Sequence, residues 1–143
     1  MALASVLLVD DEIPFVETIT KRLTRRNLDI LAAYSGDEAL EKLKAHNDVE
    51  VIILDVKMPG KDGIETLEEI KRLHPLKEVI MLTGHATVET AIEGMRLGAF
   101  DYLMKPCDID LLVAKVSDAA AKKRRHEEKI LDAQIKEITM RRV

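Results

Sequence analysis

Residues 51–63 of the chain read VIILDVKMPGKDG. The first four residues form an unbroken apolar run, which is typical of a strand covered on both faces of a parallel sheet. The run ends in Asp55, and residues 59–63 have the Pro and Gly content of a loop. Asp62 stands where it can cap a following helix. The stretch therefore predicts a buried strand, a carboxylate at its carboxyl end, and a helix beyond a short loop.

The same alternation of apolar runs and amphipathic segments extends on both sides of this stretch. The strand candidates are Val6–Val9, Asp29–Tyr34, Val51–Leu54, Val79–Leu82 and Phe100–Met104. Apolar residues at helical spacing lie between them, at Val16-Ile19-Leu23, Ala39-Leu40-Leu43, Leu67-Ile70-Leu73 and Val88-Ala91-Ile92-Met95. Ser35 offers an N-terminal cap for the second helix, and Gly98 a C-terminal cap for the fourth. Five such repeats predict a right-handed, doubly covered parallel sheet.

Length and composition are those of one globular domain. The chain has 143 residues, of which 47% are hydrophobic and 34% charged. No apolar run approaches the roughly 20 residues that cross a bilayer, and the N-terminus lacks the pattern of a signal peptide. The single cysteine, Cys107, cannot form an internal disulfide. We therefore expect a cytoplasmic protein without a membrane segment.

Charge divides the chain into an acidic body and a basic tail. Residues 122–143 hold eight Lys or Arg and four Asp or Glu, whereas residues 1–121 hold 14 and 22. An acidic body suits a cation site better than nucleic acid. From Asp108 to the end there is no Gly or Pro, and a continuous helix of that length would span about 54 Å. We predict a domain over 1–121 and a helical extension over 122–143.

Polar residues gather where the strand candidates end. Ligands of open α/β sheets bind outside the carboxyl ends of the strands, where the strand order reverses. Four strands deliver a chemical group there, namely Asp10 with Asp11, Asp55, Thr83 and Lys105. The second strand ends in Tyr34 and suits an edge. Strand order 2-1-3-4-5, adopted from known doubly wound folds, meets these conditions and places the reversal between the two groups of carboxylates.

These residue types are the ones that phosphoryl transfer to a carboxylate requires. Three carboxylates in one crevice repel one another unless a cation neutralises them, and Mg²⁺ prefers hard oxygen ligands. Asp55 is the candidate nucleophile for an aspartyl phosphate. Lys105 supplies a positive charge and Thr83 a hydroxyl donor for the phosphoryl oxygens.

Four motifs together resemble a known family. Val-Asp-Asp-Glu at 9–12, Leu-Asp-Val-Lys-Met-Pro-Gly-Lys-Asp-Gly at 54–63, Thr-Gly-His at 83–85 and Gly-Ala-Phe-Asp-Tyr-Leu-Met-Lys-Pro at 98–106 are similar to those of bacterial response regulator receiver domains. The resemblance covers about residues 1–121, in order and at the expected intervals. It implies a flavodoxin-like (βα)₅ fold in a two-component signalling protein.

The resemblance also implies roles for single residues. Mg²⁺ would be bound by Asp10, Asp11, Asp55 and the main-chain carbonyl of Lys57. A sensor histidine kinase or a histidine phosphotransfer protein would phosphorylate Asp55.

Further roles concern the response to that event. Lys105 and Thr83 would contact the phosphoryl group, and Tyr102 would change rotamer with Thr83, so that the face of strand four, helix four and strand five changes. Lys105-Pro106 would be a cis peptide. Such a protein is a signalling receiver rather than an enzyme, although it promotes its own phosphorylation and dephosphorylation.

Two other functions remain open at this point. A phosphoester hydrolase on a similar fold would carry a second carboxylate two residues after Asp55, where this chain has Lys57. A pure interaction module would not need the acidic pair or Lys105.

The tail has two interpretations of its own. Leu131, Ile135 and Ile138 suit self-association or contact with a partner, and the alternative is a linker to an output domain. The receiver motifs resemble those of stand-alone receivers and also those of longer regulators, so we expect a stand-alone receiver or a fragment. No DNA-binding motif occurs in the 143 residues, so we expect no direct binding of nucleic acid.

Overall fold

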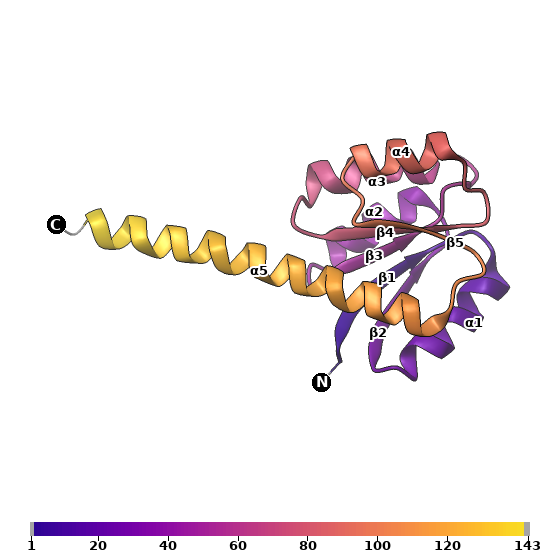
Figure 1. Ribbon diagram of the computed structural model, residues 1–143, viewed down its shortest axis with the longest axis horizontal. Helices are drawn as coiled ribbons and strands as arrows, with labels where there is room; N and C mark the ends of the chain where they lie inside the picture. Colours follow the sequence, from indigo (N-terminus) through magenta and orange to yellow (C-terminus); the bar gives the residue numbers. More distant parts are fainter. Residues whose placement is uncertain (1, 142–143) are drawn as a thin grey trace.

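The computed structural model describes residues 2–141 and shows the predicted alternation of strands and helices (Figure 1). The strands are β1 (Ala4–Val9), β2 (Leu28–Ala33), β3 (Val51–Leu54), β4 (Glu78–Thr83) and β5 (Asp101–Met104). The helices are α1 (Ile13–Thr24), α2 (Gly36–Ala45), α3 (Gly63–Leu73), α4 (Val88–Arg96) and α5 (Ile109–Arg141). Each strand contains or overlaps its predicted apolar run.

The strands form one parallel sheet in the order β2-β1-β3-β4-β5, which confirms the predicted order. Val9 of β1 lies beside Leu54 of β3. The next residues along these two strands, Asp10 and Asp55, are therefore neighbours at the carboxyl edge of the sheet. Main-chain hydrogen bonds continue past the strand ends here, because the Asp55 N–H donates to the Val9 carbonyl at 3.0 Å.

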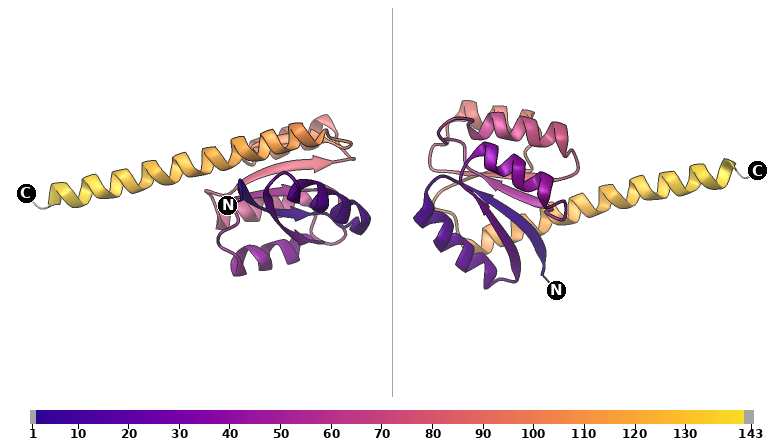
Figure 2. Two further views of the ribbon diagram at one scale, coloured as in Figure 1. Left: turned by 90° about the horizontal axis from the view of Figure 1, so that it is seen from below. Right: turned by 180° about the vertical axis from the view of Figure 1, so that it is seen from behind.

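Alternating side chains of the central strands pack into two separate hydrophobic cores, one on each face of the sheet. Val6 and Leu8 of β1 pack on the face covered by α1 and α5, whereas Leu7 and Val9 pack on the face covered by α2 and α3. Figures 1 and 2 show these helices on opposite sides of the sheet, with α4 on the same side as α2 and α3. Burial of β1, β3 and β4 on both faces explains their continuous apolar runs.

Local capping chemistry confirms the predicted helix ends. The Ser35 hydroxyl accepts from the Glu38 N–H at 3.1 Å at the start of α2, and the Asp62 carboxylate accepts from the Glu65 N–H at 2.9 Å at the start of α3. Gly98 follows α4 with φ of 99°, a left-handed conformation that glycine adopts without strain. The Lys105-Pro106 peptide is cis, as the family resemblance implies.

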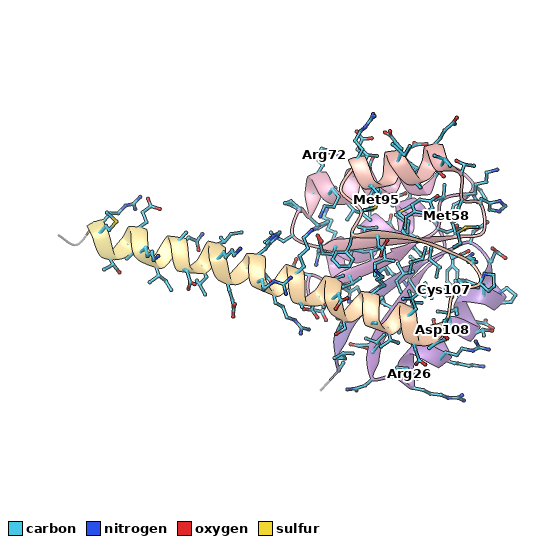
Figure 3. The ribbon with its side chains drawn as sticks, in the orientation of Figure 1. Arg26, Met58, Arg72, Met95, Cys107 and Asp108 are labelled. Carbon is cyan, nitrogen blue, oxygen red and sulfur yellow. The ribbon has the colours of Figure 1, made fainter. Side chains whose placement is uncertain are left out.

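Helix α4 exposes much of its apolar stripe to solvent, whereas the simplest interpretation of such a stripe is burial in the core. The stripe forms a helix as predicted, yet Val88 is 76% exposed and Ile92 56% exposed, and Met95, labelled in Figure 3, is exposed as well. Only Gly94 of this helix is buried. The helix rests on the sheet through this glycine, which lies against the Tyr102 ring. An apolar surface therefore faces solvent over α4, a feature that periodicity alone does not distinguish from core.

Helix α5 continues well past the sheet. Its first part packs on the core through Leu112, Val116, Ala119 and Ala120, whereas every residue from Arg124 to Arg141 is exposed. Its 33 residues span about 50 Å, and the distal half projects from the body in both views of Figure 2. Within residues 2–141, no helix combines the length and the apolar character needed to cross a membrane.

Candidate functional site

Three carboxylates meet at the carboxyl edge of the sheet. Ligand oxygens of Asp10, Asp11 and Asp55 all lie within 4.8 Å of one another. Asp10 and Asp55 are almost fully buried, and Asp11 is the most accessible of the three. The structure thus brings together the acidic residues that the strand ends predicted, and it does so between β1 and β3, where the strand order reverses.

Asp10 uses both of its oxygens. Oδ1 accepts from the Glu12 N–H at 2.9 Å, and Oδ2 accepts from the Lys105 ammonium at 2.6 Å. Burial raises the pKa of Asp10, and the nearby Asp55 carboxylate adds to this, so that the lowering effects of Lys105 and the Glu12 N–H are outweighed. Keeping Asp10 ionised in this crevice is therefore costly without further positive charge.

Asp55 keeps one oxygen without a close partner among the described residues. Its Oδ1 accepts from the Val56 N–H at 2.8 Å, while Oδ2 lies 3.9 Å from the Lys105 ammonium. Gly63 is pressed against this segment, because a Cβ added there would lie 1.9 Å from the Asp55 carbonyl oxygen. Only glycine fits at position 63, and its close approach holds the main chain that carries the carboxylate.

Lys105 is the cation that the structure places among these acids. Besides Asp10 and Asp55, its ammonium approaches Glu12 Oε1 at 3.2 Å and the Phe15 ring centroid at 4.0 Å. Burial acts to lower the pKa of Lys105, but the hydrogen bond to Asp10 and the charges of Asp10 and Asp55 outweigh it and leave this pKa raised. Lys105 therefore stays protonated, and it offsets only part of the negative charge of the crevice.

The contacts of Glu12 and Phe15 were not predicted from the sequence. Glu12 directly follows the acidic pair, so its place in the motif was the available signal. Phe15 is separated from Lys105 by 90 positions along the chain, and nothing local marks it.

Thr83 and Tyr102 have separate partners in this structure. Thr83 is buried, and its hydroxyl accepts from the His85 N–H at 3.0 Å. Tyr102 is half-buried, and its hydroxyl lies 2.8 Å from the Thr90 hydroxyl, which belongs to the capping box at the start of α4. Tyr102, which the family resemblance implies would change rotamer with Thr83, is thereby linked to α4, a contact that the sequence did not indicate.

The donors at this edge suit a hard divalent cation. They are carboxylate oxygens from adjacent strand ends, and Lys105 pairs with Asp10 and approaches Asp55. Mg²⁺ takes one or two carboxylates, carbonyl oxygens and waters in this manner. Met58 in the loop after β3 and Cys107 after β5 lie toward the same end of the molecule (Figure 3).

Comparison with known proteins identifies the family to which the chain belongs. The family model for the response regulator receiver domain matches residues 6–117. The chain belongs to the response regulator receiver domain family. This receiver domain is 36% identical to the receiver domain protein of Clostridium thermocellum, whose structure covers 85% of this chain and 97% of its own with a TM-score of 0.81.

Curated relatives are longer proteins. The chain is 39% identical over 116 residues to the transcriptional regulatory protein ZraR of Escherichia coli K12, and 38% identical over 112 residues to the DNA-binding transcriptional regulator NtrC of Klebsiella pneumoniae. These matches cover 81% and 78% of this chain but 26% and 24% of the relatives. The receiver domain thus spans about a quarter of the length of the curated relatives it matches.

Family membership assigns the general activity. Receiver domains act in two-component signal transduction, and phosphorylation of an aspartate is general to the family. The chain has the acidic crevice that this activity needs.

Proposed function

We propose that Asp55 is the phosphoacceptor of this receiver domain and that Asp10, Asp11, Asp55 and the main-chain carbonyl of Lys57 hold Mg²⁺ beside it. One observation carries the proposal. Three carboxylates from two neighbouring strand ends lie within 4.8 Å of one another, and Lys105 pairs with Asp10 and approaches Asp55. The charge surplus and the oxygen donors favour a bound cation, and Mg²⁺ when bound would neutralise the acids and the incoming phosphoryl oxygens.

The chain's own residues then make the transfer possible. Asp55 Oδ1 is fixed by the Val56 N–H, which leaves Oδ2 to attack phosphorus. A bond forms between Oδ2 and phosphorus while the bond between phosphorus and the donor's imidazole nitrogen breaks, and the donor histidine leaves with that electron pair. Lys105, which lies 3.9 Å from Oδ2, stabilises the negative charge on the transferred group.

Thr83 and Tyr102 convert the chemical event into a change of surface. The Thr83 hydroxyl turns from the His85 N–H toward a phosphoryl oxygen, and Tyr102 turns into the space that Thr83 leaves. That movement ends the contact between Tyr102 and Thr90 at the start of α4. The face of β4, α4 and β5 then takes a second arrangement, as a shift of population between two packings.

The donor and the reader of the switch are proteins. A sensor histidine kinase or a histidine phosphotransfer protein supplies the phosphoryl group, because a phosphohistidine has the reactive bond that an aspartate can displace. The receiver domain itself is a signalling component that assists its own phosphorylation and dephosphorylation. The exposed apolar side chains of α4 form a surface that a protein reader can distinguish.

The distal part of α5 joins the receiver domain to a second copy of the chain or to an output domain. Leu131, Ile135 and Ile138 are exposed on it, which suits pairing with a second copy of the chain or packing in a linker to an output domain. The NtrX protein of Brucella abortus, 30% identical with a TM-score of 0.81, covers 94% of this chain and therefore reaches into the extension. That match supports the linker. This chain covers 30% of the NtrX chain, so most of NtrX lies outside the matched region.

Mass spectrometry tests the phosphoacceptor. The protein is treated with acetyl phosphate and Mg²⁺, and the wild type is compared with Asp55→Asn and with Asp132→Asn, an exposed site on the distal helix. We expect one phosphoryl group on the wild type and on Asp132→Asn, and none on Asp55→Asn. An equal gain of mass in all three would refute the proposal.

Light scattering tests the role of the distal helix. The full chain is compared with a variant that carries Leu131→Glu, Ile135→Glu and Ile138→Glu. A drop from dimer to monomer mass supports pairing between copies. Equal monomer masses leave the linker as the role of the helix.

A further inference from the structure

The ammonium of Lys105 sits in a seat with two different halves. Asp10 Oδ2 at 2.6 Å and Asp55 Oδ2 at 3.9 Å form the half that belongs to the proposed cation site. Glu12 Oε1 at 3.2 Å and the face of the Phe15 ring, with its centroid at 4.0 Å, form the other half. Glu12 is the N-cap residue of α1 and Phe15 lies in the first turn of that helix, so both are outside the group of metal-binding candidates.

We infer that Phe15 is a positioning residue for Lys105, which keeps the ammonium in the crevice when a cation takes Asp10. This inference rests on the proposed function of Asp55, which it deepens. A cation bound to Asp10 competes with Lys105 for the same carboxylate oxygen. The Phe15 ring then remains as a wall of the seat, so that the ammonium stays near Asp55 instead of moving out to water.

An aromatic ring suits this task better than another carboxylate. The negative face of the ring attracts a cation without acting as a strong hydrogen-bond acceptor. The N–H groups of Lys105 therefore stay available for phosphoryl oxygens. A fourth carboxylate in place of the ring would hold the ammonium more tightly and would repel the incoming phosphate.

The surroundings of Phe15 make the ring a fixed wall. Phe15 is partly buried and packs against the core cluster that α1 and α5 share with the sheet. Pro14, at the first turn of α1, sets the direction in which the chain enters the helix. Lys105, in contrast, has a long and flexible side chain. The fixed Phe15 ring therefore restricts the movement of the flexible Lys105 side chain.

A second lysine near an aromatic ring provides an internal control. The Lys122 ammonium lies 5.7 Å from the Phe100 ring centroid, away from the crevice. Phe100→Met should remove an aromatic ring beside Lys122 in the same way without changing the contacts of Lys105. Phe15→Met keeps the volume and the apolar character of position 15 but removes the ring face, and Phe15→Tyr keeps the face.

The experiment follows Lys105 directly and then its effect. Lysine side chains are labelled with ¹³C, and the Lys105 signal is assigned from Lys105→Arg. A ring face shifts neighbouring protons upfield, so the ε-CH₂ signal of Lys105 reports the contact with and without Mg²⁺. The rate of phosphorylation by acetyl phosphate and the dissociation constant of Mg²⁺, from calorimetry, are measured on the same variants.

We expect the upfield shift to persist when Mg²⁺ binds to the wild type and to Phe15→Tyr, and to vanish in Phe15→Met. Phosphorylation of Phe15→Met should slow by about two- to fivefold, the rate equivalent of one cation–π contact, with an unchanged dissociation constant for Mg²⁺. Phe100→Met should keep the wild-type rate. Phosphorylation of Phe15→Met at the wild-type rate would overturn the inference, and so would loss of the shift when Mg²⁺ binds to the wild type. A wild type that takes no phosphate would instead refute the function proposed for Asp55.

Discussion

The carboxyl and amino edges of the sheet carry clusters of acidic residues whose negative charge is balanced to different degrees. At the carboxyl edge, Asp10, Asp11 and Asp55 lie together, and Lys105 pairs with Asp10 and approaches Asp55. At the amino edge, Glu50 and Glu78 each meet basic residues that match them. Glu78 lies 3.2 Å from the Lys71 ammonium and 3.3 Å from that of Lys122.

The amino edge also anchors the long helix. Arg124 of α5 binds Glu50 with two nitrogens, Nε at 2.7 Å and Nη2 at 2.8 Å, and Nη2 also donates to the Leu3 carbonyl at 3.1 Å. The helix leaves the body directly after these contacts, since every residue from Arg124 to Arg141 is exposed. The core packing of its first part sets the direction of the helix, and these contacts of Arg124 fasten it where it leaves the body.

The difference separates a binding site from a structural cluster. Acids matched by cations of the same chain satisfy one another and need no ligand. Acids in surplus destabilise the protein until an outside cation joins them, which is the condition for a metal site. The following predictions test this contrast, in order of decreasing effect.

Mg²⁺ should stabilise the wild type strongly. Ligand that binds only the folded state at about 100 times its dissociation constant adds about 2.7 kcal/mol to the free energy of unfolding. Thermal unfolding with and without Mg²⁺ measures the gain. Asp11→Asn should lose most of it because one candidate ligand is gone, whereas Asp132→Asn should keep it. An equal gain in Asp11→Asn would remove Asp11 from the site.

Glu78→Gln should destabilise the protein without changing its response to Mg²⁺. Glu78 is 3% exposed, and its charge is shared by Lys71 and Lys122. Loss of a charged hydrogen bond costs about 1–2 kcal/mol, because Lys71 retains the carbonyls of Pro75 and Lys77. Urea unfolding measures the loss, with the exposed Glu128→Gln as the control. A variant as stable as Glu128→Gln would show that the amino edge gains nothing from its ion pairs.

Asp55→Asn should stabilise the metal-free protein at neutral pH by about 1 kcal/mol, the order of a single-site change. The raised pKa of Asp10 means that stability falls as the pH rises from the ordinary range of an aspartate to this higher value. Removing the charge of Asp55 reduces that loss. The gain should disappear in acid, where Asp10 is protonated and no longer repels a charge at position 55. Chemical unfolding at several pH values with a chelator present measures it, and a gain that persists in acid would assign it to another cause.

Arg124→Gln should have the smallest effect, a loss of about 0.5 kcal/mol at neutral pH, because Arg124 is half exposed. Burial acts to raise the pKa of Glu50, but the hydrogen bonds from Arg124 and the Ser5 N–H outweigh it and lower this pKa. The contribution is therefore present above the ordinary glutamate range and is lost as the pH falls through the lowered value. Unfolding of the wild type, Arg124→Gln and the exposed neighbour Arg125→Gln at neutral and acidic pH checks it. An unchanged difference in acid would contradict the role of Glu50.

Much of the fold and most of the candidate site could be predicted from local signals. Apolar runs marked all five strands, and Ser35 and Asp62 marked the starts of two helices. Asp10, Asp55 and Lys105 were found because each follows a strand, and the structure brings them together. The domain boundary near residue 121 and the individual site roles stay predictions.

Other features had no local signal. The exposure of Val88 and Ile92 could not be predicted, because an apolar stripe has the same spacing whether it faces a core or a partner. The contact of Phe15 with Lys105 and that of Tyr102 with Thr90 join separate elements, so no periodicity reports them. The same holds for Gly63, whose need arises from the approach of the Asp55 carbonyl oxygen.

The sequence by itself determined which residues end each strand, and therefore which groups reach the carboxyl edge of the sheet. That information is local, because a strand begins and ends with its own apolar run. Only the tertiary structure decided which oxygen of Asp55 stays open, what surrounds the Lys105 ammonium, and where α5 leaves the body. These features depend on several segments being in place at once, and contact distances of a few ångströms follow from packing rather than from any single stretch of chain.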